Sequence, residues 1–151
     1  MDRLQDIEDR LAILALQVDY ARAADSFDGD LYASVFTEDG VLDASQCGFP
    51  VARGRQQIAA VMNDAFRQQT HNIHLTTNQR VLTIDGDRAA GFAYFFQRSL
   101  LKNGGRTEFA GRYDDDYRRT AAGWKISRRV LIELLPTVVE GYDLGAEGQS
   151  G

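Results

Sequence analysis

The chain has 151 residues, of which 44% are hydrophobic, so it can bury one core but not two, and we expect a single domain over residues 1–140. Its net charge of −5, with no Lys/Arg cluster at either end, argues against a nucleic-acid or anionic-membrane partner bound through positive charge. No apolar run approaches the roughly 18 residues of a membrane span, and the charged N-terminus is unlike a signal peptide. We therefore expect a cytoplasmic protein whose partner is a small molecule.

The N-terminal half shows helical periodicity. Apolar residues recur at steps of three and four from residue 4 to residue 21, which predicts an amphipathic helix over residues 3–24 with this stripe packed on the core. The same reasoning predicts a short helix over 30–36, a strand over 41–44 and a third helix over 54–68. The members of the first stripe are Leu4, Ile7, Leu11, Leu14, Val18 and Ala21.

From His71 onward the pattern changes to strands. We predict strands near 72–84, 88–101, 107–119 and 124–134, joined by glycine-containing turns, with the last strand ended by Pro136. Helices followed by an antiparallel meander indicate an α+β fold in which the first helix covers the sheet. Residues 141–151 are Gly-rich and polar, so we expect a flexible C-terminal tail.

Asp25 continues a series of seven-residue steps through Leu4, Leu11 and Val18, so a carboxylate stands where the pattern calls for an apolar residue. A core-facing carboxylate must find a partner, because an unpaired buried charge is too costly. The alternative is a cap or a solvated last turn, and the spacing does not decide between the two interpretations.

His74, Thr76 and Asn78 share one face of the predicted strand 72–84, which suggests a polar row lining a ligand cavity. In the alternative interpretation this row faces water, and the intervening Ile73 and Leu75 face the core. His71 lies on the opposite face of the strand from His74, so the two histidines cannot bind one metal ion, and we predict no metal site.

Two further groups of side chains have ordinary structural explanations. The run Asp114–Asp116 and the nearby arginines are typical of solvated strand faces with cross-strand ion pairs, with one arginine excepted below. The stripe Phe92, Tyr94 and Phe96 is predicted to be core, whereas Phe95, Phe109, Tyr113 and Tyr117 are expected to line a cavity or an interface.

The single Cys47 is interpreted as an ordinary thiol. No phosphate-binding glycine loop, serine elbow or Cys-x-x-Cys motif occurs, and we expect no cofactor.

Several short segments together resemble the SnoaL-like branch of the nuclear-transport-factor-2-like superfamily over about residues 5–135. They are Tyr20-Ala-Arg-Ala-Ala-Asp25-Ser-Phe-Asp28, Phe36-Thr-Glu-Asp-Gly-Val-Leu-Asp43, Arg53-Gly54-Arg55, His74-Leu-Thr-Thr-Asn78, Asp85-Gly-Asp87 and Gly123-Trp124-Lys125. The resemblance implies a cone-shaped barrel, in which three helices and a curved sheet enclose a deep apolar pocket.

Within that superfamily the chain is most similar to the scytalone dehydratase and hexachlorocyclohexane dehydrochlorinase subgroup, whose members place an aspartate at the end of the first helix and a histidine on the first long strand. Asp25 and His74 match these positions. The resemblance implies that Asp25 orients His74, which acts as a general base. Arg129 matches an arginine that assists the leaving group in the dehydrochlorinase, although the adjacent Arg128 leaves the register open by one residue.

The chain also departs from the dehydratase pattern. The positions of the two pocket tyrosines of the dehydratases are occupied by Ala24 and Ala44, and their second histidine is replaced by Ser99. These differences argue against scytalone as the substrate.

The sequence thus predicts a cofactor-independent lyase or isomerase acting on a small, largely apolar ring or ketone. The expected catalytic residues are Asp25 and His74, and the expected substrate-binding residues are Tyr20, Arg129, Asn78 and Tyr113. The alternative is a non-catalytic small-ligand-binding or assembly module of the same fold. In either case we expect a homo-oligomer, dimer or trimer, because such a sheet leaves an apolar outer face.

Overall fold

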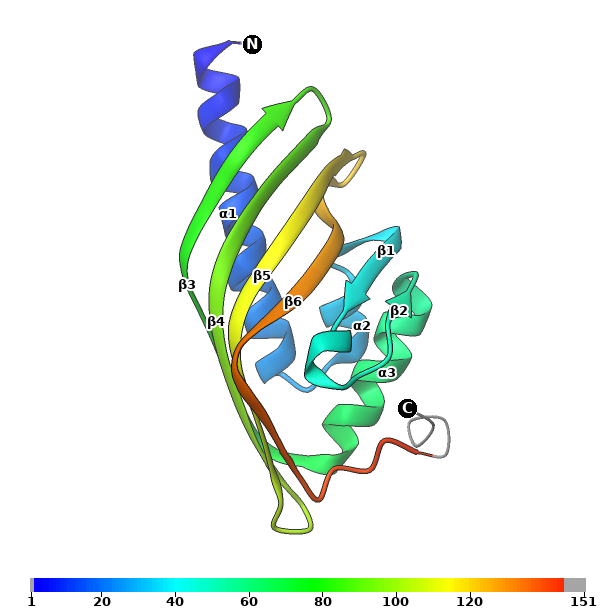
Figure 1. Cartoon of the computed structure of the whole chain (residues 1–151). Helices are drawn as coiled ribbons and strands as arrows, with labels where there is room; N and C mark the ends of the chain where they lie inside the picture. The colour runs from blue at the N-terminus through cyan, green and yellow to red at the C-terminus, as the bar shows by residue number, and fades with distance from the viewer. Residues whose placement is uncertain (1, 146–151) are drawn as a thin grey trace.

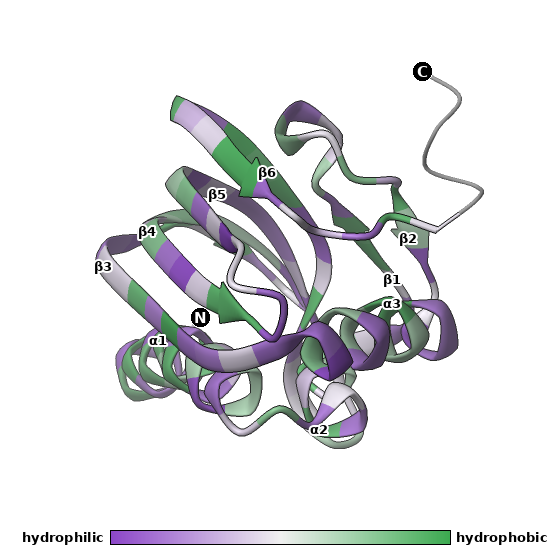
Figure 2. Ribbon diagram, turned by 90° about the horizontal axis from the view of Figure 1, so that it is seen from below, coloured by the Kyte–Doolittle hydropathy of each residue, from purple (hydrophilic) through white to green (hydrophobic). Residues whose placement is uncertain are grey.

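The computed structural model describes residues 2–145, and over these residues three α-helices lie along one face of a six-stranded sheet (Figures 1 and 2). The helices are α1 (Arg3–Asp25), α2 (Gly29–Ala33) and α3 (Arg55–Gln68), with a short 3-10 helix, η1 (Ser45–Cys47). The strands are β1 (Phe36–Asp43), β2 (Ala52–Arg53), β3 (Gln69–Asp85), β4 (Arg88–Leu101), β5 (Arg106–Thr120) and β6 (Gly123–Glu140).

The predicted α+β architecture with a four-stranded antiparallel meander is confirmed. The strand order is β2-β1-β6-β5-β4-β3, and β1 runs parallel to β6 while all other neighbours are antiparallel. The long strands bend strongly, so that the sheet curves around the helices (Figure 1). Gly86 and Gly104 have φ values of 58° and 87°, which explains why glycine stands in the turns that join β3 to β4 and β4 to β5.

The prediction that Pro136 ends the last strand is wrong. β6 continues through Pro136 to Glu140, and its pairing with β1 stops at Val130. The register with β5 is irregular between Glu108 and Ala110, opposite this proline. Pro136 is tolerated because it lies at a bulge in a part of β6 that has a strand neighbour on one side alone.

The face that α1 turns toward the sheet also differs from the prediction. Leu4, Leu11 and Val18 are more than half exposed, so the apolar stripe faces outward in the single chain. The buried face carries polar groups as well as apolar ones, because the sheet supplies partners for them. Its buried members are Asp9, Ile13, Leu16, Gln17, Tyr20, Ala23 and Ala24.

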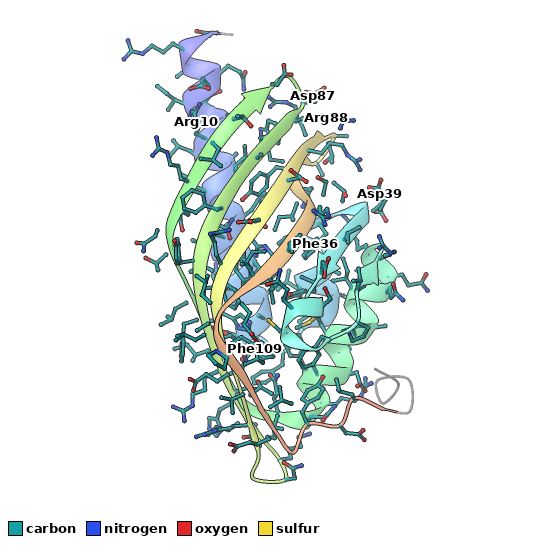
Figure 3. All side chains as sticks on the ribbon, in the orientation of Figure 1. Arg10, Phe36, Asp39, Asp87, Arg88 and Phe109 are labelled. Carbon is teal, nitrogen blue, oxygen red and sulfur yellow. The ribbon has the colours of Figure 1, made fainter. Side chains whose placement is uncertain are left out.

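A buried carboxylate joins the first half of α1 to the sheet. Both oxygens of Asp9 accept hydrogen bonds from the Arg119 guanidinium, at 2.8 and 2.6 Å, and Oδ1 also accepts from the Trp124 indole at 3.0 Å. Nearby, Arg10, labelled in Figure 3, donates to the Val81 carbonyl of β3 at 3.2 Å. The hydrogen bonds from Arg119 and then Trp124 hold the pKa of the Asp9 carboxyl well below its usual range.

The segment that follows β6, which belongs to the stretch predicted to be a flexible tail, contacts the domain. The Gln68 side chain of α3 donates to the carbonyl of Asp143 and accepts from its backbone N–H, both at 2.9 Å. The ring of Tyr142 packs edge-on against Phe49, with centroids 5.4 Å apart. The remainder of the predicted tail, residues 146–151, lies outside the described residues.

Among residues 2–145, no helix combines the length and the apolar character that crossing a bilayer requires. The expected self-association is a prediction that the single chain does not test, and the outward stripe of α1 offers apolar surface for it.

We predict that the Asp9→Asn variant is less stable than the wild type by about 2 kcal/mol at pH 7, because charged hydrogen bonds are lost in a buried place. A carboxylate whose pKa is lowered by folding stabilises the protein above its unfolded pKa of about 3.9, and this contribution is lost as the pH falls. The difference in free energy of unfolding between wild type and Asp9→Asn, measured by urea unfolding, should therefore become smaller as the pH is lowered from 7 to 3.

The matched control is Asp6→Asn on the same helix. Asp6 forms an ion pair with Arg10 in which both side chains are more than a third exposed, so the pair should contribute less than about 0.5 kcal/mol to stability. A difference for Asp9→Asn that stays constant with pH would contradict the assignment of the Asp9 charge.

Candidate active site

A cavity of about 110 Å³ lies between the concave face of the sheet and the helices. Its wall is mainly apolar and aromatic, with a few polar side chains contributed by α1, β3, β4 and β5. The lining includes Tyr20, Tyr32, Leu42, Phe49, Met62, Phe66, Asn72, His74, Phe95, Gln97, Thr107, Phe109, Tyr113, Leu131 and Tyr142. Such an apolar hollow with few polar groups is typical of a small-molecule site.

The polar row on β3 faces inward, which settles the alternative left open by the sequence. Asn72, His74 and Thr76 are half-buried, whereas Ile73 and Leu75 are about half exposed on the other side of the strand. His74 therefore points into the cavity, and the interpretation that placed Ile73 and Leu75 in the core is wrong.

Asp25 and His74 are in contact. The Nδ1 atom of His74 lies 3.1 Å from Oδ1 of Asp25, and the His74 backbone N–H donates to Oδ2 of the same carboxylate at 3.3 Å. The His74 side chain is 9% exposed and that of Asp25 is 35% exposed. One carboxylate at the end of α1 thus fixes both the backbone and the ring of His74.

This contact defines the chemistry that the imidazole can perform. A carboxylate accepts hydrogen bonds, so the neutral ring carries its proton on Nδ1 and has its lone pair on Nε2. Among residues 2–145, no protein group is hydrogen-bonded to Nε2, and His74 lines the cavity. Nε2 is therefore available to accept a proton from a bound molecule.

Two of the predicted substrate-binding tyrosines line the cavity beside His74. The ring centroid of Tyr20 lies 6.1 Å from that of His74 and 5.4 Å from that of Tyr113, and Tyr113 stacks on Phe95 at 4.1 Å. Tyr32 donates its hydroxyl proton to the Tyr20 oxygen. Burial raises the pKa of Tyr32 and of Tyr113 well above the usual value, so both phenols keep their protons.

Arg129, not Arg128, is the arginine that points inward, but it does not line the cavity. Arg129 is fully buried, whereas the Arg128 side chain is about half exposed. The Arg129 guanidinium carbon lies 4.2 Å from the ring centroid of Tyr20 and 3.9 Å from that of Tyr113. The two rings separate the guanidinium from the cavity, so the expectation that Arg129 contacts a substrate directly is wrong.

The charge of Arg129 is balanced by a buried network. Its Nε and Nη2 atoms donate to the two oxygens of Asp115 at 2.8 and 2.7 Å, and Nη2 also donates to Oε1 of Gln17 at 2.6 Å. Asp115 further accepts from the Tyr117 hydroxyl at 2.7 Å and from Gln17 Nε2 at 3.0 Å. Although burial works against the charge, Asp115 raises the pKa of Arg129 well above its usual value.

Other expectations also need correction. Asn78 is exposed, has φ 52° and lies in the irregular stretch of β3 between Thr77 and Arg80, so it is not in the cavity. Asp115 is buried and ion-paired, unlike the solvated acid that was predicted. Tyr94 is 37% exposed, and Phe92 and Phe96 share its outer side of β4. Strand alternation explains this reversal, because the neighbouring Phe95 takes the inward position.

Four residues of the site and its surroundings were not predicted as such from the sequence: Tyr32, Gln97, Asp115 and Tyr142. Alternation along β4 could have identified Gln97, which shares the inward face with Phe95. No local signal distinguished Asp115 from the flanking Asp114 and Asp116. Among residues 2–145, no group of three or more His, Cys, Asp or Glu side chains is arranged to hold a metal ion.

We predict that Arg129→Met and Asp115→Leu each lower the free energy of unfolding by about 3–5 kcal/mol, because each leaves an uncompensated buried charge. The double variant should lose much less than the sum, since neither charge is then left alone. Urea unfolding of the four proteins provides the measurement. Additive losses would contradict the pairing.

The comparisons with known proteins identify the family. A family model described as a SnoaL-like domain matches residues 5–130. An uncharacterized protein of Mycobacterium tuberculosis is 34% identical over 128 residues, covering 83% of this chain and 85% of its own length.

Two solved structures extend the comparison. A proposed aromatic ring hydroxylase from Novosphingobium aromaticivorans is 37% identical with a TM-score of 0.83, covering 88% of this chain and 94% of its own. A hexachlorocyclohexane dehydrochlorinase has a TM-score of 0.80 at 20% identity, covering 91% and 93%, and shows the shared fold. The family match over most of the chain, supported by these relatives, shows that the protein belongs to the SnoaL-like domain family.

Proposed function

We propose that the protein is a lyase or isomerase that needs no cofactor for its proton transfer and acts on a small, largely apolar ring ketone or related carbon acid. The observation that carries this proposal is the contact of Asp25 with Nδ1 of His74, a residue that lines the apolar cavity, which leaves Nε2 without a partner among the described residues. A histidine held in this way is a suitable general base.

In the proposed reaction, Nε2 of His74 removes a proton from a carbon next to the substrate carbonyl. The C–H electron pair moves toward the carbonyl and gives an enolate, while Asp25 stabilises the imidazolium that forms. In an elimination, the enolate electrons form a C=C bond and expel a group from the neighbouring carbon, and the imidazolium proton completes a departing hydroxide as water. In an isomerisation, the same proton returns to a different carbon.

Tyr20 is proposed to stabilise the enolate oxygen. Its oxygen accepts the Tyr32 proton, so the Tyr20 hydroxyl retains its own proton for donation to another acceptor, and Tyr20 lines the cavity. The positive charge of Arg129 lies over the ring faces of Tyr20 and Tyr113 and attracts their π electrons. This attraction should make the phenol a stronger donor toward negative charge, and Arg129 would then act through the rings as a positioning residue.

The size of the cavity supports a substrate built on a single ring. An apolar cavity of about 150 Å³ in another protein binds benzene, which is the same order as the hollow found here. The related proposed aromatic ring hydroxylase is, by its name, directed to an aromatic ring, and the dehydrochlorinase to a chlorinated cyclohexane. These names support ring compounds as the substrate class.

The alternative function is binding of the same class of ligand without turnover. The observation that favours it is the apolar character of the cavity, which by itself suits binding as well as catalysis. In that case Asp25 and His74 form a structural polar pair, and the experiment below separates the two functions.

We predict that wild-type protein in D₂O exchanges the C2 hydrogens of 3-hydroxycyclohexanone and converts this probe to cyclohexenone, observed by NMR and by absorbance. His74→Ala should lower both rates by about 10²–10⁴-fold, because the general base is removed. His71→Ala is the matched control, since His71 is exposed on the opposite face of β3 and should leave both rates unchanged. Folding is checked by circular dichroism, and equal rates for wild type and His74→Ala would exclude the mechanism.

We also predict that Asp25→Asn lowers kcat by at least about tenfold while the fold is retained. The carboxylate accepts from the ring and from the backbone N–H of His74 through its two oxygens, whereas asparagine places an NH₂ donor at one of these two positions. The same deuterium-exchange assay provides the measurement. An Asp25→Asn variant as fast as the wild type would show that Asp25 does not orient the base.

A further inference from the structure

One wall of the cavity carries a polar network that the proposed proton transfer does not use. Gln97 of β4, Asn72 of β3 and Thr107 of β5 all line the cavity, and Gln97 is 5% exposed. In the register of the sheet, Gln97 lies directly opposite His74. Side chains of directly opposed residues on one face have Cβ atoms roughly 4.5–5.5 Å apart, so Gln97 is an immediate neighbour of the proposed base.

The orientation of the Gln97 side-chain amide follows from a chain of hydrogen bonds that begins at the backbone. The carbonyl of Ala24 can accept but not donate, so the group of Asn72 that lies 3.1 Å from it is the NH₂. Oδ1 of Asn72 then faces Gln97 and accepts from Nε2 at 3.0 Å. The same Nε2 lies 3.4 Å from Oγ1 of Thr107. Each step fixes the next, so the nitrogen of Gln97 points into the network.

The oxygen of Gln97 is left without a partner. Oε1 is buried, and no hydrogen-bond donor among the described residues reaches it. A buried acceptor without a donor is destabilising, and such groups are uncommon in folded proteins. A ligand that brings an O–H or N–H group to this place would remove the deficit.

We propose that Gln97 determines ligand specificity by accepting a hydrogen bond from a hydroxyl or N–H group of a neutral ring compound. The inference rests on the proposed use of this cavity for a small molecule, but it does not depend on proton transfer by His74. A carbonyl or carboxylate oxygen at the same place would face Oε1 with like partial charge. The wall therefore favours hydroxylated or N–H-bearing rings over ketone or acid groups at this position.

The ligand would thus make polar contacts at two positions in the cavity, one at Gln97 and one at the Tyr20 hydroxyl. An amide oxygen cannot stabilise a developing oxyanion, so the group bound by Gln97 keeps its proton during the reaction. The oxygen that becomes negative belongs instead near the Tyr20 hydroxyl. The substrate class inferred for this site is a ring with one carbonyl and a separate hydroxyl or N–H group near the acidic carbon.

The test uses two probes of equal size, phenol and toluene, which differ in the presence of a hydroxyl donor. Their dissociation constants are measured by NMR titration of wild-type protein and of Gln97→Met. The ratio of the toluene constant to the phenol constant should fall about tenfold in Gln97→Met, because the partner of the hydroxyl is lost. Taking the ratio cancels general effects of the substitution on the cavity.

The matched control is Ser99→Ala. Ser99 belongs to the same network through a 2.5 Å contact between its Oγ and Oγ1 of Thr107, but it does not line the cavity. This variant should leave the ratio unchanged. A ratio that is the same in Gln97→Met as in the wild type, or that falls equally in Ser99→Ala, would overturn the inference.

Two further measurements keep the test decisive. If Gln97→Met does not fold, the side-chain amide signals of Gln97 in the wild type are followed instead, and they should move with phenol but not with toluene. Equal movement with both probes would contradict the inference. The ratio is measured from binding alone, whereas the deuterium-exchange assay reports proton transfer, so a failure here and a failure of the proposed proton transfer are recognised separately.

Discussion

The contact between Asp25 and His74 is the interaction on which the site depends. The carboxylate at the last residue of α1 binds the ring and the backbone N–H of a residue on β3, and so joins a helix end to the strand that it covers. The surrounding wall is apolar and partly closed to water, which strengthens the electrostatic interaction. The tautomer of His74 and the free lone pair on Nε2 both follow from this one contact.

The core next to the cavity is not uniformly apolar, because the charged guanidinium of Arg129 is buried there. Arg129 is paired with Asp115 and Gln17, although its Nη1 has no partner among the described residues, and its guanidinium packs on the rings of Tyr20 and Tyr113. A charge buried in this way is stable only when it is paired, so the network constrains where both rings lie. The polar wall around Gln97 also contains a buried group without a protein partner, the acceptor Oε1, and Gln97 lines the cavity whereas Arg129 does not.

The sequence was sufficient for the α+β class and the meander, because turn glycines and strand alternation are local signals. Spacing left the orientations of Asp25 and His74 open, and only the resemblance to the family indicated that the two side chains meet. The sequence failed on α1, where two stripes share helical spacing and the apolar one is exposed. Which stripe is buried depends on partners such as Arg119 and Arg129, which are more than 90 positions distant from α1. Asp115 and Asn78 were misplaced for the same kind of reason, since ion pairing across strands and a bulge in β3 are not visible in a linear pattern.

The most direct test of the central claim is the tautomer of His74, which nitrogen-15 NMR of the imidazole ring determines in the wild-type protein. We predict that the neutral form of the ring carries its proton on Nδ1 and a lone pair on Nε2, and that the Nε2 signal changes when phenol enters the cavity. His71, which lies on the outer side of β3, provides the internal reference. A His74 ring protonated on Nε2, or one that matches His71 and ignores phenol, would contradict it.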